Sequence, residues 1–229
     1  KLQFQKLDDP RNTWLCEPHD FFSNARIAVY TSIYGQYDQI KVPITVPDNC
    51  DFFIFTDLDV RPDQVWVKRE VNWQGIPDIS NNLLKNRYVK LFPHLLFPEY
   101  EFSVYVDGSI QIRTDLTEFI QQMNAPGIKF HRHPYRNCAY QEIRMCQKKN
   151  KESRDKLEKQ YQYFMKDGFP ENYGLLEAGV IIRDHRNPAW QEIMPDWWHQ
   201  ITHFSYRDQV SLAYSLWKHK IAIDSVALL

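Results

Sequence analysis

Cysteine, glycine and methionine are scarce in this chain of 229 residues, which has four cysteines, seven glycines and four methionines. Cys16, Cys50, Cys138 and Cys146 are too few and too scattered to staple a domain of this size, so we expect reduced, buried thiols. No apolar run approaches the ~20 residues that span a bilayer. Residues 1–20 also lack the basic-then-apolar order of a signal peptide. These absences favour a soluble protein without a transmembrane segment, and we expect it in the cytoplasm.

An excess of charge of either sign is also absent. The chain has 28 Lys and Arg against 29 Asp and Glu, a formal net charge of -1 and a pI of about 6.8. It therefore has no global positive field to hold a nucleic-acid backbone, and we expect no nucleic-acid partner. An anionic ligand must instead be captured by local residues.

The residues that are present suit one large core. Hydrophobic residues make up 43% of the chain and aromatic residues 15%, which fits one sizeable domain better than two small ones. Residues 1–25 show little periodicity and are expected to form an N-terminal arm, and residues 26–229 a single domain. Because the first residue is Lys1 and not Met, we expect a piece of a longer chain.

Strand and helix patterns alternate along the chain. Residues 26–32 (RIAVYTS) and 51–56 (DFFIFT) are β-branched and aromatic runs typical of buried strands. Residues 65–69 alternate like a strand with one wet face. Apolar residues at helical spacing predict a helix over residues 81–97, which Pro93 should kink or divide.

The second half continues this order. Residues 101–112 (EFSVYVDGSIQI) predict a strand interrupted at residues 107–109, followed by a helix over residues 116–123. A strand at residues 175–183 (LLEAGVIIR) and a helix at residues 207–218 close the domain. Such alternation predicts an α/β fold with a mostly parallel central sheet flanked by helices, whose ligands sit at the carboxyl ends of the strands.

Asp107 has the position of a site residue, because the apolar strand stops there and Gly108 and Ser109 follow. A hard divalent cation needs only one or two protein carboxylates when substrate phosphates fill its other positions, so Asp107 can dock a metal diphosphate. The alternative is an ordinary Asp-Gly turn.

Other ionisable residues have two readings. Glu177 lies inside an apolar strand, where a carboxylate costs several kcal/mol unless it is paired, which favours a functional role. Asp208 opens the last helix, where the helix dipole favours an acid for structural reasons alone. Lys85, Arg87 and Lys90 can neutralise a diphosphate or lie solvated on the helix surface.

Three motifs together resemble a known family. Residues 88–98 (YVKLFPHLLFP) and 104–112 (VYVDGSIQI) resemble the helix and strand before the metal motif of family-eight retaining glycosyltransferases with the GT-A fold. Residues 177–182 (EAGVII) resemble the family's strand before the active site, and Asp208 with Gln209 resembles its Asp-Gln pair. The chain is most similar to a related glycosyltransferase-like branch that shares motifs such as VYTSIYGQYD and RDQVSLAYSLWK.

The resemblance extends over residues 26–223 and implies a GT-A-like fold and a function. It implies transfer of a sugar from a nucleotide-diphosphate sugar to a saccharide or glycoconjugate acceptor, with retention, assisted by Mn²⁺ or Mg²⁺, in polysaccharide biosynthesis. The residues implied to bind the donor are Tyr30, Thr31, Tyr34, Asp57, Arg87, Lys90 and Ser109. The implied metal ligands are Asp107 and Ser109. The implied catalytic residues are Glu177, Asp208 and Gln209.

The chain departs from the family at the metal motif. Ser109 replaces the usual second Asp, so we expect either a low metal affinity or binding that is independent of a metal. The family's distal His ligand has no counterpart before Leu229, so it is missing, lies outside this sequence, or is replaced by one of the histidines His131, His133 and His185. The basic cluster of His131, Arg132, His133 and Arg136 forms either a wall of the acceptor or phosphate site or a surface loop.

Two other functions therefore stay open at this point. A non-catalytic sugar- or polymer-binding domain would keep the fold and lose the metal, and the seven Trp and thirteen Tyr would supply stacking surfaces. A hydrolase would use the same acids on water. The joint presence of Glu177 and Asp208 favours the transferase over a pure binding domain.

Overall fold

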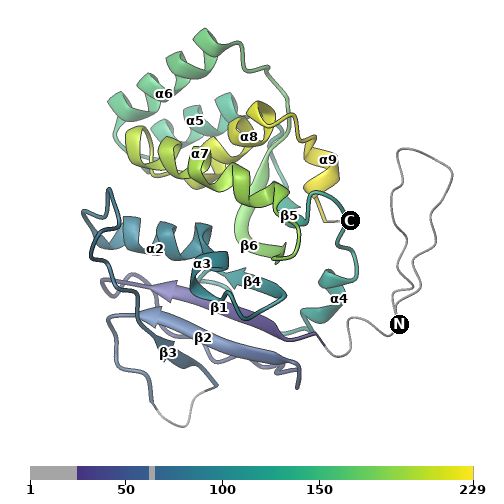
Figure 1. Ribbon diagram of the computed structural model, residues 1–229. Helices are drawn as coiled ribbons and strands as arrows, with labels where there is room; N and C mark the ends of the chain where they lie inside the picture. Colours follow the sequence, from purple (N-terminus) through teal and green to yellow (C-terminus); the bar gives the residue numbers. More distant parts are fainter. Residues whose placement is uncertain (1–24, 62–64, 229) are drawn as a thin grey trace, which may run out of the picture.

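A six-stranded mixed sheet forms the centre of the protein in the computed structural model, which describes residues 25–61 and 65–228 (Figure 1). The expected N-terminal arm lies outside the described residues apart from Ala25. The strand order is β3-β2-β1-β4-β6-β5. The strands are β1 (Ile27–Ile33), β2 (Cys50–Thr56), β3 (Val67–Arg69), β4 (Phe102–Val106), β5 (Ile128–Arg132) and β6 (Leu176–Asp184).

The direction of the strands brings several strand ends to one edge. β1 pairs in parallel with β2 and β4, and β2 with β3, whereas β6 runs antiparallel to both β4 and β5. Val106 at the end of β4 faces Val180 in the middle of β6. The carboxyl ends of β1, β2 and β4 therefore lie at the same edge of the sheet as the first half of β6. The predicted α/β fold with a mostly parallel sheet is confirmed.

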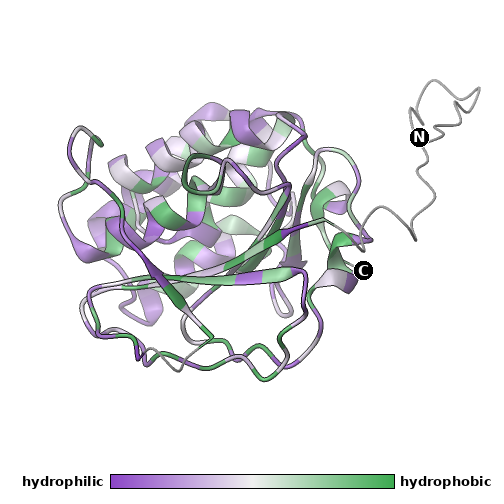
Figure 2. Ribbon diagram, turned by 60° about the horizontal axis from the view of Figure 1, so that its bottom comes forward, coloured by the Kyte–Doolittle hydropathy of each residue, from purple (hydrophilic) through white to green (hydrophobic). Residues whose placement is uncertain are grey.

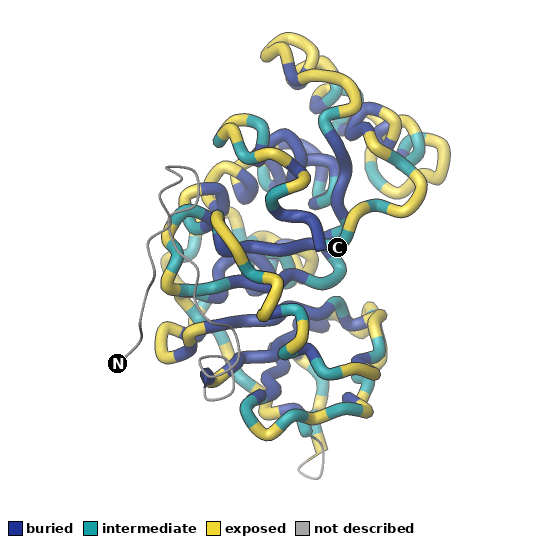
Figure 3. Tube along the Cα trace, turned by 90° about the vertical axis from the view of Figure 1, so that its right-hand side faces the viewer, coloured by how far each residue is buried: buried dark blue, intermediate teal, exposed yellow. Residues whose placement is uncertain are grey.

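The helices cover the two faces of the sheet unequally. A large core joins the face that carries Tyr30, Tyr105 and Ile181 to α2, α5, α6, α7 and α8, while the other face packs on α4 and on loops (Figure 1). Figure 2 shows the strands as largely hydrophobic and Figure 3 shows them buried beneath exposed loops and outer helix turns. The helices are α2 (Asn82–Leu91), α3 (Pro93–Leu96), α4 (Thr117–Ile120), α5 (Ala139–Lys148), α6 (Arg154–Asp167), α7 (Ala189–His203), α8 (Asp208–Lys218) and α9 (Ile223–Val226).

Most of the predicted elements are present, with three corrections. The helix predicted over residues 81–97 is divided at Pro93 into α2 and α3, as expected from proline. The strand predicted to resume after residues 107–109 does not, because Ile112 instead accepts a hydrogen bond from Ile44 in the loop after β1. The helix predicted over residues 116–123 shortens to α4, and α7 was not predicted at all.

Among the described residues, no helix has both the length and the apolar character that a membrane crossing requires. The longest, α7, has 15 residues and carries a proline, Pro195, in its interior.

A buried polar clamp fixes the end of α2. The carbonyl oxygen of Lys90 accepts hydrogen bonds from the Tyr30 hydroxyl at 3.2 Å and from the Arg183 guanidinium at 2.8 Å. Arg183 also donates to the Tyr30 hydroxyl at 3.0 Å, and both side chains are fully buried. A cation at this end of the helix also complements the helix dipole. The clamp therefore ties α2 to β1 and β6.

The clamp predicts a stability difference between two tyrosines. Tyr30→Phe should lower the free energy of unfolding by about 1–3 kcal/mol, because it leaves Arg183 with one partner fewer in a buried site. The matched variant Tyr37→Phe alters a side chain that is 88% exposed and should change it by less than about 0.5 kcal/mol. Urea unfolding of both variants is the measurement, and equal effects would contradict the role of the clamp.

A second prediction concerns acid. Burial and the nearby Arg183 guanidinium lower the pKa of His94 and of His185 to about 4. The pKa of histidine in the unfolded state is about 6.5, so between pH 4 and 6.5 the native state binds fewer protons than the unfolded state. The stability of the native state therefore decreases as the pH is lowered through this range. We expect the urea concentration at the midpoint of unfolding to be constant above pH 6.5 and to decrease as the pH is lowered from 6.5 towards 4.

The control for this prediction is a pair of histidine variants. His185→Asn should flatten the decline, whereas His203→Asn, at the exposed end of α7, should leave its slope unchanged. An identical slope in wild type and His185→Asn would show that other groups cause the acid sensitivity.

Candidate active site at the edge of the sheet

Asp107 lies directly after β4, where the carboxyl ends of the parallel strands meet. Its backbone N–H donates to the Gly179 carbonyl at 2.8 Å, which joins it to β6. Its Oδ1 atom accepts from the Tyr105 hydroxyl at 2.8 Å and lies 3.4 Å from the Lys90 ammonium. The side chain is 34% exposed, so one carboxylate oxygen is held and the other is available to a ligand.

Two glycines keep space around Asp107. A methyl group on Gly108 would come within 2.7 Å of the Ile33 side chain, so only glycine lets this turn pack against β1. A methyl group on Gly179 would lie 3.0 Å from the Ile110 side chain and 3.6 Å from Asp107 Oδ2. The absence of a side chain at Gly179 therefore leaves room beside the available oxygen.

Lys90 and Asp208 form a buried ion pair behind Asp107. The Lys90 ammonium lies 2.6 Å from Asp208 Oδ2, and its side chain is 1% exposed. Asp208 Oδ1 accepts from the Gln209 backbone N–H at 3.0 Å, at the start of α8. Burial raises the pKa of Asp208, but Arg87 and Lys90 outweigh it and hold that pKa well below its usual value.

This burial corrects two expected roles. Lys90 was expected to contact a diphosphate and Asp208 to surround the anomeric carbon, but both side chains are sealed from solvent by their own pairing. They can act on a ligand only through Asp107 and Arg87. A buried carboxylate retains its charge only with such partners, which is why the two residues occur together.

Arg87 is the predicted basic residue that reaches the surface of the site. Its side chain is 15% exposed and its Nε atom lies 3.6 Å from Asp208 Oδ2. Burial lowers the pKa of Arg87, but Asp208 and Asp107 more than compensate, so the net shift is upward. The guanidinium also donates to Asn86 Oδ1 at 2.6 Å, which sets its direction on α2.

Glu177 and Gln209 are accessible at the same edge. Glu177 is half-buried in β6 opposite His131 of β5, two residues before the glycine that bonds to Asp107. Within the described residues its carboxylate has no hydrogen bond or ion pair, although its charge acts to raise the pKa of His133. Gln209 is half-buried in the first turn of α8. These side chains can meet a ligand that Asp208 cannot.

The expected nucleotide pocket is only partly assembled from the predicted residues. Tyr30 lies in the core as part of the clamp, and Thr31 is 4% exposed, so neither lines an open pocket. Asp57 is exposed, and its two carboxylate oxygens share one bifurcated hydrogen bond from the Gly35 backbone N–H, at 3.1 and 2.9 Å. Tyr34 is half-buried and its ring lies 6.0 Å from that of Trp73. Asp57 and Tyr34 therefore remain as candidates, joined by the turn at Gly35.

The residues fit a divalent ion only with ligands from a substrate. Asp107 Oδ2 and the exposed Ser109 hydroxyl are the oxygens on offer, and the described residues contain no group of three His, Cys, Asp or Glu able to hold a metal. Mg²⁺ and similar ions accept such sparse protein ligation when phosphates and waters complete the shell. The donor set therefore suits a metal diphosphate and not a resident metal.

None of the proposed substitutes supplies a third metal ligand. His185 bonds to Ser103 and lies beyond the amino end of β4, at the opposite edge from Asp107. His133 accepts from the backbone N–H groups of Tyr135 and Arg136. The His131 ring contacts the Phe119 ring edge-on, with centroids 6.1 Å apart.

The basic cluster after β5 is also largely neutralised. Arg132 pairs with Asp224, and Arg136 donates to Glu142 at 2.5 Å. The buried Glu142 further accepts from the Cys146 thiol at 3.4 Å. Burial and Glu142 raise the pKa of Cys146, as suits the inert thiol predicted from the sequence. Of the two alternatives left open for this cluster, the internal pairing of both arginines favours a structural loop over a wall of the acceptor or phosphate site.

Tyr105 is a site residue that the sequence analysis missed. Its hydroxyl holds Asp107 Oδ1, and the Lys90 ammonium lies 5.0 Å from its ring centre. Strand alternation was the available signal, because Tyr105 and Asp107 are two residues apart and so share a face of the sheet.

Comparison with known proteins agrees with the architecture. The family model described as TOD1/MUCI70, glycosyltransferase-like domain, matches residues 17–227. The chain is 22% identical over 223 residues to "Probable hexosyltransferase MUCI70" of Arabidopsis thaliana, which covers 86% of this chain and 38% of that protein. The chain thus spans well under half the length of this curated relative.

Of two solved structures compared with this chain, the first is similar in fold. WbbM, a bifunctional glycosyltransferase, has a TM-score of 0.54 at 12% identity, covering 90% of this chain and 39% of that one. Mouse xyloside xylosyltransferase 1 has a TM-score of 0.49 at 10% identity, covering 90% and 84%. The fold implied by the GT-A resemblance is confirmed. Since the family match extends over most of the sequence, this chain belongs to the TOD1/MUCI70 family of glycosyltransferase-like domains.

Proposed function

We propose that this domain transfers a sugar from a nucleotide-diphosphate sugar to a saccharide or glycoconjugate acceptor, with retention of configuration and with the help of a divalent metal ion. One observation carries the proposal. Asp107, half-exposed and backed by Lys90 and Arg87, shares an edge of the sheet with Glu177, whose carboxylate has no hydrogen bond or ion pair to the residues that the structure describes. Charges of both signs are thus available where a diphosphate leaves and a hydroxyl attacks.

The donor side rests on Arg87 and Asp107. Arg87 is the guanidinium of α2, is 15% exposed at the surface of the site, and has a planar fork that suits bidentate contact with phosphate oxygens. Bound Mn²⁺ or Mg²⁺, held by Asp107 and Ser109 together with the diphosphate, would stabilise negative charge on the leaving group. Lys90 keeps Asp107 Oδ1 in place, so the free Oδ2 atom faces the donor. Asp57 and Tyr34 remain our candidates for the nucleoside.

The acceptor side rests on Glu177 and Gln209. A carboxylate that lacks an internal partner can accept a hydrogen bond from the acceptor hydroxyl and turn its oxygen towards the anomeric carbon. Gln209 can donate to and accept from sugar hydroxyls. Asp208, in contrast, is a positioning residue, because its carboxylate is occupied by Lys90 and by the first turn of α8.

The chemical class of the sugar and the setting of the enzyme are further parts of the proposal. The relative's name, a probable hexosyltransferase, supports a hexose as the transferred sugar and is consistent with a role in polysaccharide biosynthesis. The cytoplasmic location expected from the sequence stays a prediction.

A non-catalytic saccharide-binding domain is the second candidate. Ser109 at the position of a second carboxylate and the sealed Asp208 favour it, because both weaken the catalytic set expected from the resemblance. A binding domain has no need for a nucleotide, which separates the two candidates in one measurement.

That measurement is a thermal-shift screen. One of the diphosphates of uridine, guanosine, cytidine and thymidine, with Mn²⁺, should raise the melting temperature by about 5–10 °C at a hundredfold excess over Kd. Asp107→Ala should abolish the shift. Asp48→Ala, at an exposed carboxylate before β2, should leave it intact.

The outcomes divide the proposal into its parts. A shift of equal size without Mn²⁺ would contradict metal assistance but keep the nucleotide donor. The absence of a shift with every nucleotide, with and without Mn²⁺, would overturn the transferase and favour the binding domain.

A last prediction tests Lys90 as the centre of the site. Lys90→Met should lower the free energy of unfolding by about 3–5 kcal/mol, because it leaves a buried carboxylate without its closest cation. The double variant Lys90→Met/Asp208→Asn should recover part of that loss. Lys85→Met, on the half-buried surface of the same helix, should cost less than about 1 kcal/mol. Chemical unfolding of wild type, these three variants and the single variant Asp208→Asn is the measurement, and additive effects of the substitutions at Lys90 and Asp208 would contradict the coupling.

A further inference from the structure

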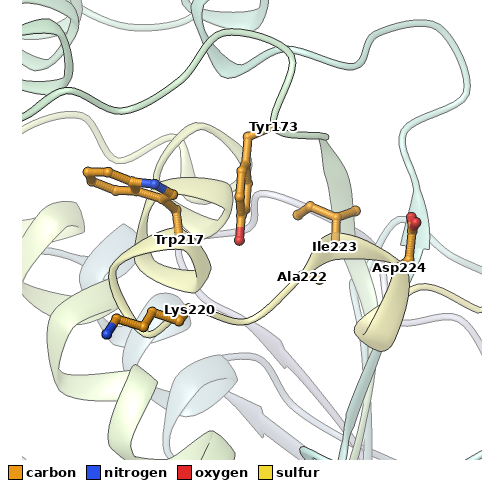
Figure 4. A pocket seen from close by; sticks show the side chains of 6 residues that line it. All are labelled: Tyr173, Trp217, Lys220, Ala222, Ile223 and Asp224. Carbon is orange, nitrogen blue, oxygen red and sulfur yellow. The ribbon is translucent and has the colours of Figure 1, made fainter.

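A pocket separate from Asp107 opens between the loop before β6, the end of α8 and the start of α9 (Figure 4). Its volume is about 330 Å³, and its lining combines two large aromatic rings with one cationic and one anionic side chain. The lining residues are Tyr173, Trp217, Lys220, Ala222, Ile223 and Asp224.

The aromatic rings of this pocket are fixed before any ligand arrives. The Tyr173 hydroxyl donates to the Ile221 carbonyl at 2.8 Å, which bridges the two loops. The Trp217 ring packs on Phe169 and Tyr214, with centroids 5.4 and 5.7 Å apart. Both rings remain half-buried, so part of each is open to solvent. A preorganised ring loses little conformational freedom when it binds a ligand.

The mixture of groups suits a saccharide. The C–H face of a sugar ring is apolar and covers an aromatic ring, while its hydroxyl groups need donors and acceptors at the rim. The ammonium of Lys220 and the carboxylate of Asp224 supply these, and both residues are exposed. Asp224 Oδ1 pairs with Arg132, which leaves Oδ2 to accept from a sugar hydroxyl, and a purely apolar ligand would leave the Lys220 ammonium unused.

The position of the pocket relates it to the acceptor side of the site. Tyr173 precedes Glu177 by four residues, and the intervening chain leads directly into β6. Four residues span at most about 14 Å. An oligosaccharide of a few units can therefore contact the pocket with one end and reach Glu177 with the other.

We propose that this pocket binds a distal unit of the saccharide acceptor, with the sugar ring on Trp217 and Tyr173 and its hydroxyls on Lys220 and Asp224. The proposal rests on the proposed transferase function and adds an acceptor subsite to it. It implies that the domain prefers long acceptors over short ones.

The test is binding of defined oligosaccharides to the chain of residues 1–229 without nucleotide. Tetra- and hexasaccharides of glucose, xylose, mannose, galactose and a uronic acid serve as probes in calorimetry and ligand-observed NMR. At least one hexasaccharide should bind wild type, and Trp217→Ala should weaken it by about tenfold or more. Trp217→Phe should restore most of the affinity, because it keeps a ring in place.

Two further sets of variants are controls that separate a loss of binding from a loss of folding. Lys220 and Asp224 are exposed, and the surface ion pair of Asp224 with Arg132 contributes little to stability, so Lys220→Ala and Asp224→Ala should both fold. Each should weaken binding about threefold to tenfold. Tyr161→Ala removes a half-buried ring of α6 that is not part of the pocket lining, and should bind like wild type. Equal affinity of wild type, Trp217→Ala and Asp224→Ala for the bound hexasaccharide would overturn the pocket.

The result is distinguishable from a failure of the proposed function. Asp107→Ala should lose nucleotide binding and keep hexasaccharide binding at this pocket. If nucleotides bind wild type but no probe oligosaccharide does, the acceptor subsite is wrong and the transferase stands. If the oligosaccharide binds and no nucleotide does, the pocket stands as the site of a saccharide-binding domain.

Discussion

Lys90 is fixed both at its backbone carbonyl and at its side-chain ammonium, and the candidate site depends on these two sets of contacts. Its carbonyl oxygen is held by Tyr30 and Arg183 in the core, and its ammonium lies between Asp208 and Asp107. The first contact ties α2 to β1 and β6, and the second ties it to α8 and to the end of β4. A buried ammonium without carboxylates would be unfavourable by several kcal/mol, so the fold and the charge distribution of the site support each other.

This arrangement gives acidic residues near the site different tasks. The Asp208 carboxylate contacts Lys90, Arg87 and the backbone at the start of α8, and its low pKa keeps it charged as a permanent counter-ion. The two carboxylate oxygens of Asp107 have different surroundings. Oδ1 contacts Tyr105 and Lys90, and Oδ2 lies beside the space at Gly179. Glu177 has no hydrogen bond or ion pair in the described part of the chain and is the one of these three acids most available to an acceptor. The chemistry we propose follows from this division of roles more than from the number of acids.

Much of the fold could be predicted from local patterns. Local sequence predicted the apolar strands β1, β2 and β6 and the break at the proline between α2 and α3. These features depend on burial and backbone geometry, which act on neighbouring residues. The site was predicted less completely. Asp107 was recognised by its place at a strand end, but Tyr30 and Thr31 were assigned to a pocket although both lie in the core. One-dimensional spacing does not reveal which face of a fully buried strand points to a ligand.

The sequence by itself determined the α/β class, the family resemblance and the presence of acids and bases near the ends of strands, because these depend on periodicity and short motifs. Only the tertiary structure decided which charges are paired. Lys90 and Asp208 are 118 residues apart in sequence and 2.6 Å apart in space. Trp217 and Tyr173 also come from distant parts of the sequence and line one pocket. Such contacts follow from how helices and strands pack together, and the burial that packing creates sets the charge state and accessibility of each group.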